Sequence, residues 1–123
     1  MNTNIVSVIC PIYNEEKYIA KCIDSILSQD YPQDSIEVLF IDGMSTDNTR
    51  NIVSEYSSKH RQIHLLDNPH RIVPYAMNIG IKAATGNIIV RIDGHAEYPT
   101  NYVSSLVHNL GTLDGAENVG GIW

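Results

Sequence analysis

Four short apolar runs alternate with segments of helical spacing, and this alternation constrains the fold more than any other feature of the chain. The runs are IVSVIC at 5–10, IEVLFI at 36–41, IHLL at 63–66 and IIVRI at 88–92. The segments that follow each run repeat apolar residues three and four positions apart, as one face of a helix does. Apolar strands that alternate with helices are typical of a parallel sheet covered by helices. The sequence therefore predicts an α/β fold, in which ligands bind beyond the carboxyl ends of the strands.

The composition fits one globular domain and excludes several classes of protein. Of the 123 residues, 43% are hydrophobic and 18% are charged, which is enough to bury a core. The net charge of -6 at pH 7 argues against nucleic acid as a partner, because phosphate backbones attract basic surfaces. No apolar run reaches the ~20 residues of a membrane span, and the first residues lack the features of a secretion signal, so we expect a cytoplasmic protein. Cys10 and Cys22 are expected in the core, since two cysteines are too few for a disulfide scaffold.

The fourth apolar run ends in Asp93, Gly94 and His95. Residues two apart in an extended chain project to the same side, so Asp93 and His95 can share one metal ion while Gly94 allows close approach. A mixed oxygen and nitrogen pair suits Mn²⁺ or a similar ion better than Ca²⁺. The remaining ligands would be phosphate oxygens and water. A plain turn with an exposed histidine is the alternative.

Polar residues also follow the first and second runs. Asp42 ends a strongly apolar strand, where burial costs free energy unless a donor such as a ligand N–H or hydroxyl satisfies the carboxylate. Tyr13 offers a flat face near the expected position of Asp42, which favours a planar base stacked on Tyr13 and bonded to Asp42. Asp47 or Thr49 is expected to cap the second helix, and Asn14 is expected to cap the first.

Taken together, these segments resemble the family 2 inverting glycosyltransferases of GT-A fold. The matching segments are VSVICPIYNEEKYIAKCIDSILSQ, FIDGMSTDNT and YAMNIGIKAATGNIIVRIDGHAEYP, which cover nearly the whole chain in the expected order. The resemblance implies a Rossmann-like parallel sheet flanked by helices that binds a nucleotide-diphosphate sugar. Residues 1–123 would then be the donor-binding part of a longer, truncated domain without its acceptor-binding part. The chain is also similar to the bacterial glycosyltransferases that build exopolysaccharides such as succinoglycan.

The resemblance also implies roles for single residues of a nucleotide site. Pro11, Tyr13 and Glu15 would line the base and ribose. Asp42 would accept a hydrogen bond from the base. Arg71 follows the third run, where the family often places a cation near the diphosphate.

The expected metal motif departs from the family pattern, because His95 stands where a second aspartate is usual. The resemblance implies that Asp93 and His95 bind Mn²⁺ or Mg²⁺, or that His95 contacts the diphosphate directly. Two unit charges about 4 Å apart interact by roughly 4 kcal/mol at an effective dielectric of 20, so Asp93 facing a diphosphate requires a cation between them. The family's catalytic base lies in the half of the domain that follows. Asp114 and Glu117 come too early to supply it, and no catalytic residue is assigned in this chain.

Two other classes remain open from the sequence. A sugar-phosphate nucleotidyltransferase would carry a basic, glycine-rich loop in place of PIYNEE, and a receiver-like binding module would carry a late lysine in place of DGH. The favoured interpretation is a metal-assisted, inverting glycosyltransferase that transfers sugar from UDP- or GDP-sugar to a bacterial polysaccharide or lipid-linked acceptor. The ending at VGGIW suggests a truncated domain, and it is left open whether the full-length protein lies on the cytoplasmic face of a membrane.

Overall fold

The computed structural model describes residues 4–112. Four strands form one sheet: β1 (Val6–Ile12), β2 (Ile36–Asp42), β3 (Ile63–Asp67) and β4 (Ile88–Arg91). The helices are α1 (Ile19–Leu27), the single 3-10 turn η1 (Gln33–Ser35), α2 (Thr49–Lys59), α3 (Val73–Ala83) and α4 (Tyr102–Thr112). All four predicted strands are confirmed, with ends that shift by at most two residues. The truncation expected at VGGIW, and with it Asp114 and Glu117, lies outside the described residues.

All pairings in the sheet are parallel, and the strand order is β3-β2-β1-β4. The chain therefore winds from β1 through β2 to β3, and then returns to place β4 on the other side of β1. Ligands of such sheets bind where the winding direction reverses, which here is the carboxyl end of β1 between its two neighbours. The last residues of β1, β2 and β3 lie in one register row, Ile12 beside Asp42 beside Asp67.

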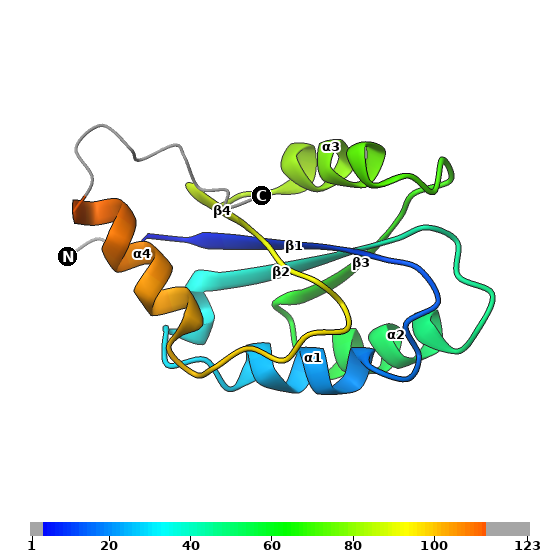
Figure 1. Ribbon diagram of the computed structural model, residues 1–123, viewed down its shortest axis with the longest axis horizontal. Coiled ribbons are helices and arrows are strands. Elements are labelled where there is room, and N and C mark those ends of the chain that lie inside the picture. The colour runs from blue at the N-terminus through cyan, green and yellow to red at the C-terminus, as the bar shows by residue number, and fades with distance from the viewer. Residues whose placement is uncertain (1–3, 113–123) are drawn as a thin grey trace.

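Both faces of the sheet are covered, which explains why the strands are apolar throughout. Alternate residues of β1 point to opposite faces, so that Val8 and Cys10 join one core cluster and Ile9 joins the other. The larger cluster receives side chains from α1, α2 and α4, and the smaller cluster receives them from α3. Figure 1 shows α3 on one side of the strands and α1 and α2 on the other. Cys10 and Cys22 are both buried in the larger cluster, as expected.

The prediction that Asn14 caps the first helix is wrong. Helix α1 begins at Ile19, and its N-cap residue Tyr18 makes no side-chain cap. Asn14 has a φ of 50°, and its side-chain oxygen instead accepts the backbone N–H of Thr46 at 2.8 Å. Asparagine tolerates this left-handed conformation better than most residues. The residue that was expected to start a helix therefore joins the loop after β1 to the loop after β2.

The start of α2 follows the sequence more closely. The helix begins at Thr49 after Asn48, and an oxygen of Asp47 accepts the Thr49 backbone N–H at 2.9 Å and its hydroxyl at 2.6 Å. Asp47 thus satisfies a free donor of the first turn from just outside the helix. Among residues 4–112, none of the helices combines the length and the apolarity that a membrane crossing needs.

Candidate functional site

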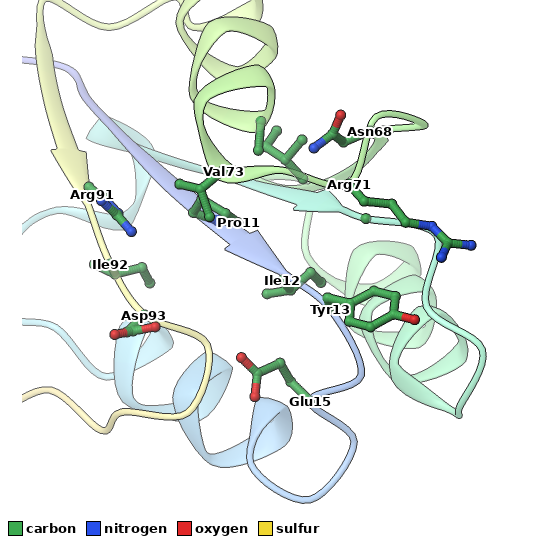
Figure 2. A pocket seen from close by; sticks show the side chains of 13 residues that line it. Pro11, Ile12, Tyr13, Glu15, Asn68, Arg71, Val73, Arg91, Ile92 and Asp93 are labelled. Atoms are coloured by element: carbon green, nitrogen blue, oxygen red, sulfur yellow. The ribbon is translucent and has the colours of Figure 1, made fainter.

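A cavity of about 200 Å³ opens at the carboxyl ends of the strands. Five of the seven predicted site residues line it: Pro11, Tyr13, Glu15, Arg71 and Asp93. Figure 2 shows that they come from three separate segments, which are the end of β1 with the loop after it, the loop after β3 and the loop after β4. The structure therefore brings together residues that are up to 82 positions apart in the sequence.

The part of the cavity wall that follows β3 contains Arg71, whose backbone is strained. Arg71 has a φ of 66°, a conformation that costs free energy for a residue with a side chain. Its guanidinium carbon lies 5.8 Å from the ring centre of Tyr13, within the range of a cation–π contact. Tyr13 remains 44% exposed. Arg71 and Tyr13 therefore present a positive charge and a flat aromatic surface beside each other.

Asn68 holds this part of the wall in place, and it was not predicted from the sequence. Asn68 is almost fully buried. Its side-chain amide donates to the carbonyl of Ile72 at 3.0 Å. Its backbone carbonyl accepts the backbone N–H of Arg71 at 3.1 Å. Its own N–H donates to the carbonyl of Asp42 at 2.7 Å. The only sequence signal was an Asn–Pro pair, which indicates a turn but not a buried amide.

Asp42 ends β2 and is buried, as its place after an apolar run predicted, but it does not line the cavity. Its side chain is completely buried and is absent from the residues that line the cavity. One oxygen accepts the Ser45 hydroxyl at 2.5 Å, and the other accepts the Ser45 N–H at 2.9 Å and Nη1 of Arg50 at 2.8 Å. The donors that a ligand was expected to supply therefore come from the protein itself. A contact between Asp42 and a base stays a prediction, and it requires one of these donors to move.

Arg50 was also missed, since nothing in the sequence pattern of α2 marks it. Its second nitrogen, Nη2, lies 2.7 Å from Asp67 at the end of β3. The hydrogen bonds that Arg50 donates, first to Asp42 and second to Asp67, raise the pKa of its guanidinium. One cation on α2 thus joins the carboxylates at the ends of two neighbouring strands.

Asp93 and His95 lie close together, but through a turn at Gly94 and His95 rather than through the extended chain that the prediction assumed, and His95 stays exposed. Glu15 joins them. One ligand atom from each of these three residues lies within 4.8 Å of the other two. Nδ1 of His95 is 3.2 Å from Oε2 of Glu15 and 3.8 Å from Oδ1 of Asp93. The hydrogen bond to Glu15 first, and then the charge of Asp93, raise the pKa of His95. Two carboxylates and an imidazole form a donor set that suits Mn²⁺ and similar ions.

The backbone of Asp93 is held at both of its polar groups. Its N–H donates to the hydroxyl of Tyr98 at 2.7 Å, and its carbonyl accepts the Cys22 thiol at 3.4 Å. Burial raises the pKa of Tyr98 to about 12, so the hydroxyl stays protonated at neutral pH. Tyr98 was not singled out from the sequence, because a single aromatic residue after a turn carries no signal of such a contact.

Positive charge at the cavity comes from two arginines. Arg91 lies at the end of β4 and lines the cavity together with Arg71. Arg91 was read from the sequence only as part of an apolar run. An acidic protein that binds an anion needs local cations, and these two side chains supply them.

A parallel sheet with a cavity lined by two arginines and a candidate metal-ligand cluster at its carboxyl edge is an arrangement typical of the GT-A class of α/β proteins. The model of glycosyl transferase family 2 matches residues 7–121. The chain therefore belongs to glycosyl transferase family 2, and the resemblance stated from the sequence is confirmed.

Relatives with known names or structures support both the family and the fold. A dolichyl N-acetyl-alpha-D-glucosaminyl phosphate 3-beta-D-2,3-diacetamido-2,3-dideoxy-beta-D-glucuronosyltransferase of Methanococcus voltae is 43% identical over 98 residues, which are 78% of this chain and 30% of the relative. The mannosyltransferase PcManGT of Pyrobaculum calidifontis, solved with GDP-Man and Mn²⁺, is 34% identical with a TM-score of 0.82, over 89% of this chain and 33% of that one. S. aureus TarS 1-349, solved with UDP-GlcNAc, is 27% identical with a TM-score of 0.77, over 87% and 31%. The chain thus spans about a third of the length of these proteins.

Proposed function

We propose that this chain is the donor-binding part of a glycosyltransferase that moves a sugar from a nucleotide-diphosphate donor to a saccharide or lipid-linked acceptor. The observation that carries the proposal is the cavity at the strand ends of a family 2 member, where Tyr13, Arg71 and Asp93 meet. Two of the similar structures hold GDP-Man and UDP-GlcNAc, which supports a nucleotide sugar as the ligand.

Different residues of the cavity bind different parts of the donor. The exposed face of Tyr13 is free to stack on a planar base, and Pro11 shapes the wall beside it. Arg71 and Arg91 offer cations to the diphosphate, and the planar guanidinium fork suits phosphate oxygens. The sugar then lies toward Asp93. This arrangement orients the bond to be broken and leaves the acceptor on the open side.

The acidic end of the cavity requires a cation, since Asp93 and Glu15 would repel a diphosphate. The donor set of Asp93 and His95 fits Mn²⁺, the ion present in the PcManGT structure. A divalent ion held there supplies positive charge that stabilises the leaving nucleoside diphosphate. Inversion at the sugar needs a base that deprotonates the acceptor hydroxyl. We expect that base outside residues 1–123.

Calorimetric titration with UDP, GDP, UDP-GlcNAc and GDP-Man, with Mn²⁺ and with a chelator, tests the proposal. We expect one nucleotide class to bind, with at least tenfold higher affinity in Mn²⁺. Tyr13→Leu should weaken binding roughly tenfold, the value of one lost base–aromatic stack, whereas the exposed Tyr75→Leu should not. Absence of binding by all four ligands, or equal effects of the two tyrosine variants, contradicts the proposal.

The acceptor and the cellular location form a further part of the proposal. The name of the Methanococcus voltae relative contains a dolichyl-linked sugar phosphate, which supports a lipid-linked acceptor. A position on the cytoplasmic face of a membrane remains part of the proposal. The rival function, a sugar-phosphate nucleotidyltransferase, predicts pyrophosphate release from a sugar 1-phosphate and a nucleoside triphosphate. Glycosyl transfer predicts release of a nucleoside diphosphate instead, so the two products separate the two functions.

A further inference from the structure

We infer that Glu15 is a third metal ligand, which completes with Asp93 and His95 a mixed oxygen and nitrogen site that prefers Mn²⁺ to Mg²⁺. The inference rests on the proposed function, because it assigns the ion that accompanies the nucleotide sugar. It gives Glu15 a role different from the base and ribose contact that the family resemblance implies.

The first support is the position of the three donor atoms. Oε2 of Glu15 is 3.2 Å from Nδ1 of His95, and the same nitrogen is 3.8 Å from Oδ1 of Asp93. Ligand atoms at about 2.1 Å from one ion are roughly 3 Å apart when they occupy adjacent positions. The separations here are close to that value, so small side-chain rotations bring all three donors onto one ion.

The second support is the packing that brings the two segments together. A Cβ built on Gly94 would lie 2.9 Å from Cγ2 of Ile12 and 3.5 Å from Oε2 of Glu15. The loop after β4 therefore lies directly against the loop after β1, and glycine is the residue that permits the approach. The backbone N–H of Glu15 is fixed on Oγ1 of Thr49 at 2.8 Å, which leaves only its side chain to adjust.

The third support is the direction of the Glu15 carboxylate. It bonds to His95, and its side chain is only 17% exposed. Glu15 lines the cavity, but its Oε2 is already engaged by His95, which directs the carboxylate toward the cluster. The residue next to it serves a separate purpose, because Glu16 accepts the backbone N–H of Asn48 at 2.7 Å. Glu16 is therefore a matched control that holds α2 and does not belong to the cluster.

The charge of the site and the types of its ligand atoms determine which divalent ion it prefers. Two ionised carboxylates and a neutral imidazole carry a charge that balances a divalent cation. Because His95 replaces the second aspartate of the usual pair, the site lacks one negative charge. The carboxylate of Glu15 restores that charge. Mg²⁺ favours oxygen ligands alone, whereas imidazole suits the transition metals. The site should therefore favour Mn²⁺ over Mg²⁺ more strongly than two aspartates would.

Binding of Mn²⁺ alone to the nucleotide-free protein, followed by electron paramagnetic resonance and calorimetry, tests the inference. Glu15→Gln should weaken Mn²⁺ binding by roughly tenfold or more, and Glu16→Gln should leave it within about twofold. Equal Mn²⁺ affinity in wild type and Glu15→Gln overturns the inference. If Glu15→Gln keeps Mn²⁺ but loses UDP or GDP measured with a chelator, the inference is overturned while the proposed function stands. Circular dichroism confirms that each variant is folded.

A second variant tests the preference of the ion. His95→Asp should bring the ratio of Mn²⁺ to Mg²⁺ affinity down by about tenfold, and it should remove the nitrogen coupling from the pulsed spectrum of bound Mn²⁺. Retention of both the ratio and the coupling overturns the assignment of His95 as a ligand. Because neither readout requires nucleotide or turnover, failure of the donor proposal would leave these results unchanged.

Discussion

Nη1 of Arg50 lies 2.8 Å from Oδ2 of Asp42, whose side chain is completely buried at the end of β2. A buried carboxylate without a cation is costly, and here the cation is Arg50 in the first turn of α2. The same guanidinium reaches Asp67, so the ends of β2 and β3 are tied together beneath the loops that carry the site.

Replacement of Arg50 should destabilise the protein. Arg50→Met leaves Asp42 buried without its charged partner, and we expect a loss of about 2 kcal/mol, since the pair is partly exposed at the arginine. Urea unfolding measures the change. Arg61→Met, at an exposed position beyond α2, should cost less than about 0.5 kcal/mol. Similar losses in both variants would contradict the role given to the ion pair.

Asp42 and Asp47 should differ in their effect on nucleotide binding. Asp42→Asn removes the charge that organises Ser45 and Arg50, and we expect UDP or GDP affinity to fall about tenfold. Asp47→Asn changes a partly exposed residue that bonds to the first turn of α2 and should leave affinity within about twofold. Titration of both variants with the preferred nucleotide, after a check of folding, makes the comparison. Equal affinities in the two variants would remove Asp42 from the site.

The hydroxyl of Tyr98 should position Asp93 for metal binding. Tyr98→Phe removes the acceptor of the Asp93 N–H but keeps the aromatic ring, and we expect Mn²⁺ affinity to fall several-fold, with tenfold as an upper bound. Tyr102→Phe is the matched control, because the Tyr102 ring packs 4.6 Å from that of Tyr98. The electron paramagnetic signal of bound Mn²⁺ reports the geometry. A purely structural role would lower the melting temperature in both variants without changing that signal.

Glu37 should make stability depend on pH at the opposite end of the sheet. Burial raises the pKa of Glu37, but hydrogen bonds from the Ser7 hydroxyl and the Thr85 backbone N–H outweigh it, and the net shift is downward. Ionised Glu37 therefore stabilises the fold above the unfolded-state pKa, and this contribution is lost as pH falls through the folded-state pKa.

We expect Glu37→Gln to cost about 1 kcal/mol of unfolding free energy at neutral pH, since it loses charge-assisted hydrogen bonds. The difference from wild type should vanish in acid, below the folded-state pKa. Urea unfolding over a pH series measures both values, with the exposed Glu55→Gln as control. A difference that is constant over the series would show that ionisation of Glu37 contributes nothing.

The sheet and the edge that carries the site could be predicted from the sequence, because both depend on local patterns. The apolar runs identified all four strands, and the polar residues after them marked the carboxyl edge. These features follow from the period of a strand and from the direction of parallel strands, which require no knowledge of distant contacts.

Contacts between segments could not be predicted in the same way. Asn14 looked like a helix cap but bonds to the loop after β2, and the contact of Glu15 with His95 had no sequence signal. Arg50 carries no sequence signal, and the Asn–Pro pair at Asn68 indicates only a turn, although both residues hydrogen-bond to Asp42. In each case the partner lies on another strand end, and the choice among several polar partners depends on distances that only packing sets.

The sequence by itself determined the parallel α/β sheet, the family and the place of the site, since apolar periodicity and chain order specify which ends of the strands meet. Only the tertiary structure decided which donors each carboxylate receives. In the structure, Asp42 accepts hydrogen bonds from Ser45 and Arg50, and Glu15 lies beside His95. The physical reason is that hydrogen bonds and ligand sets are decided within a few tenths of an ångström, and packing of the loops against each other fixes those distances.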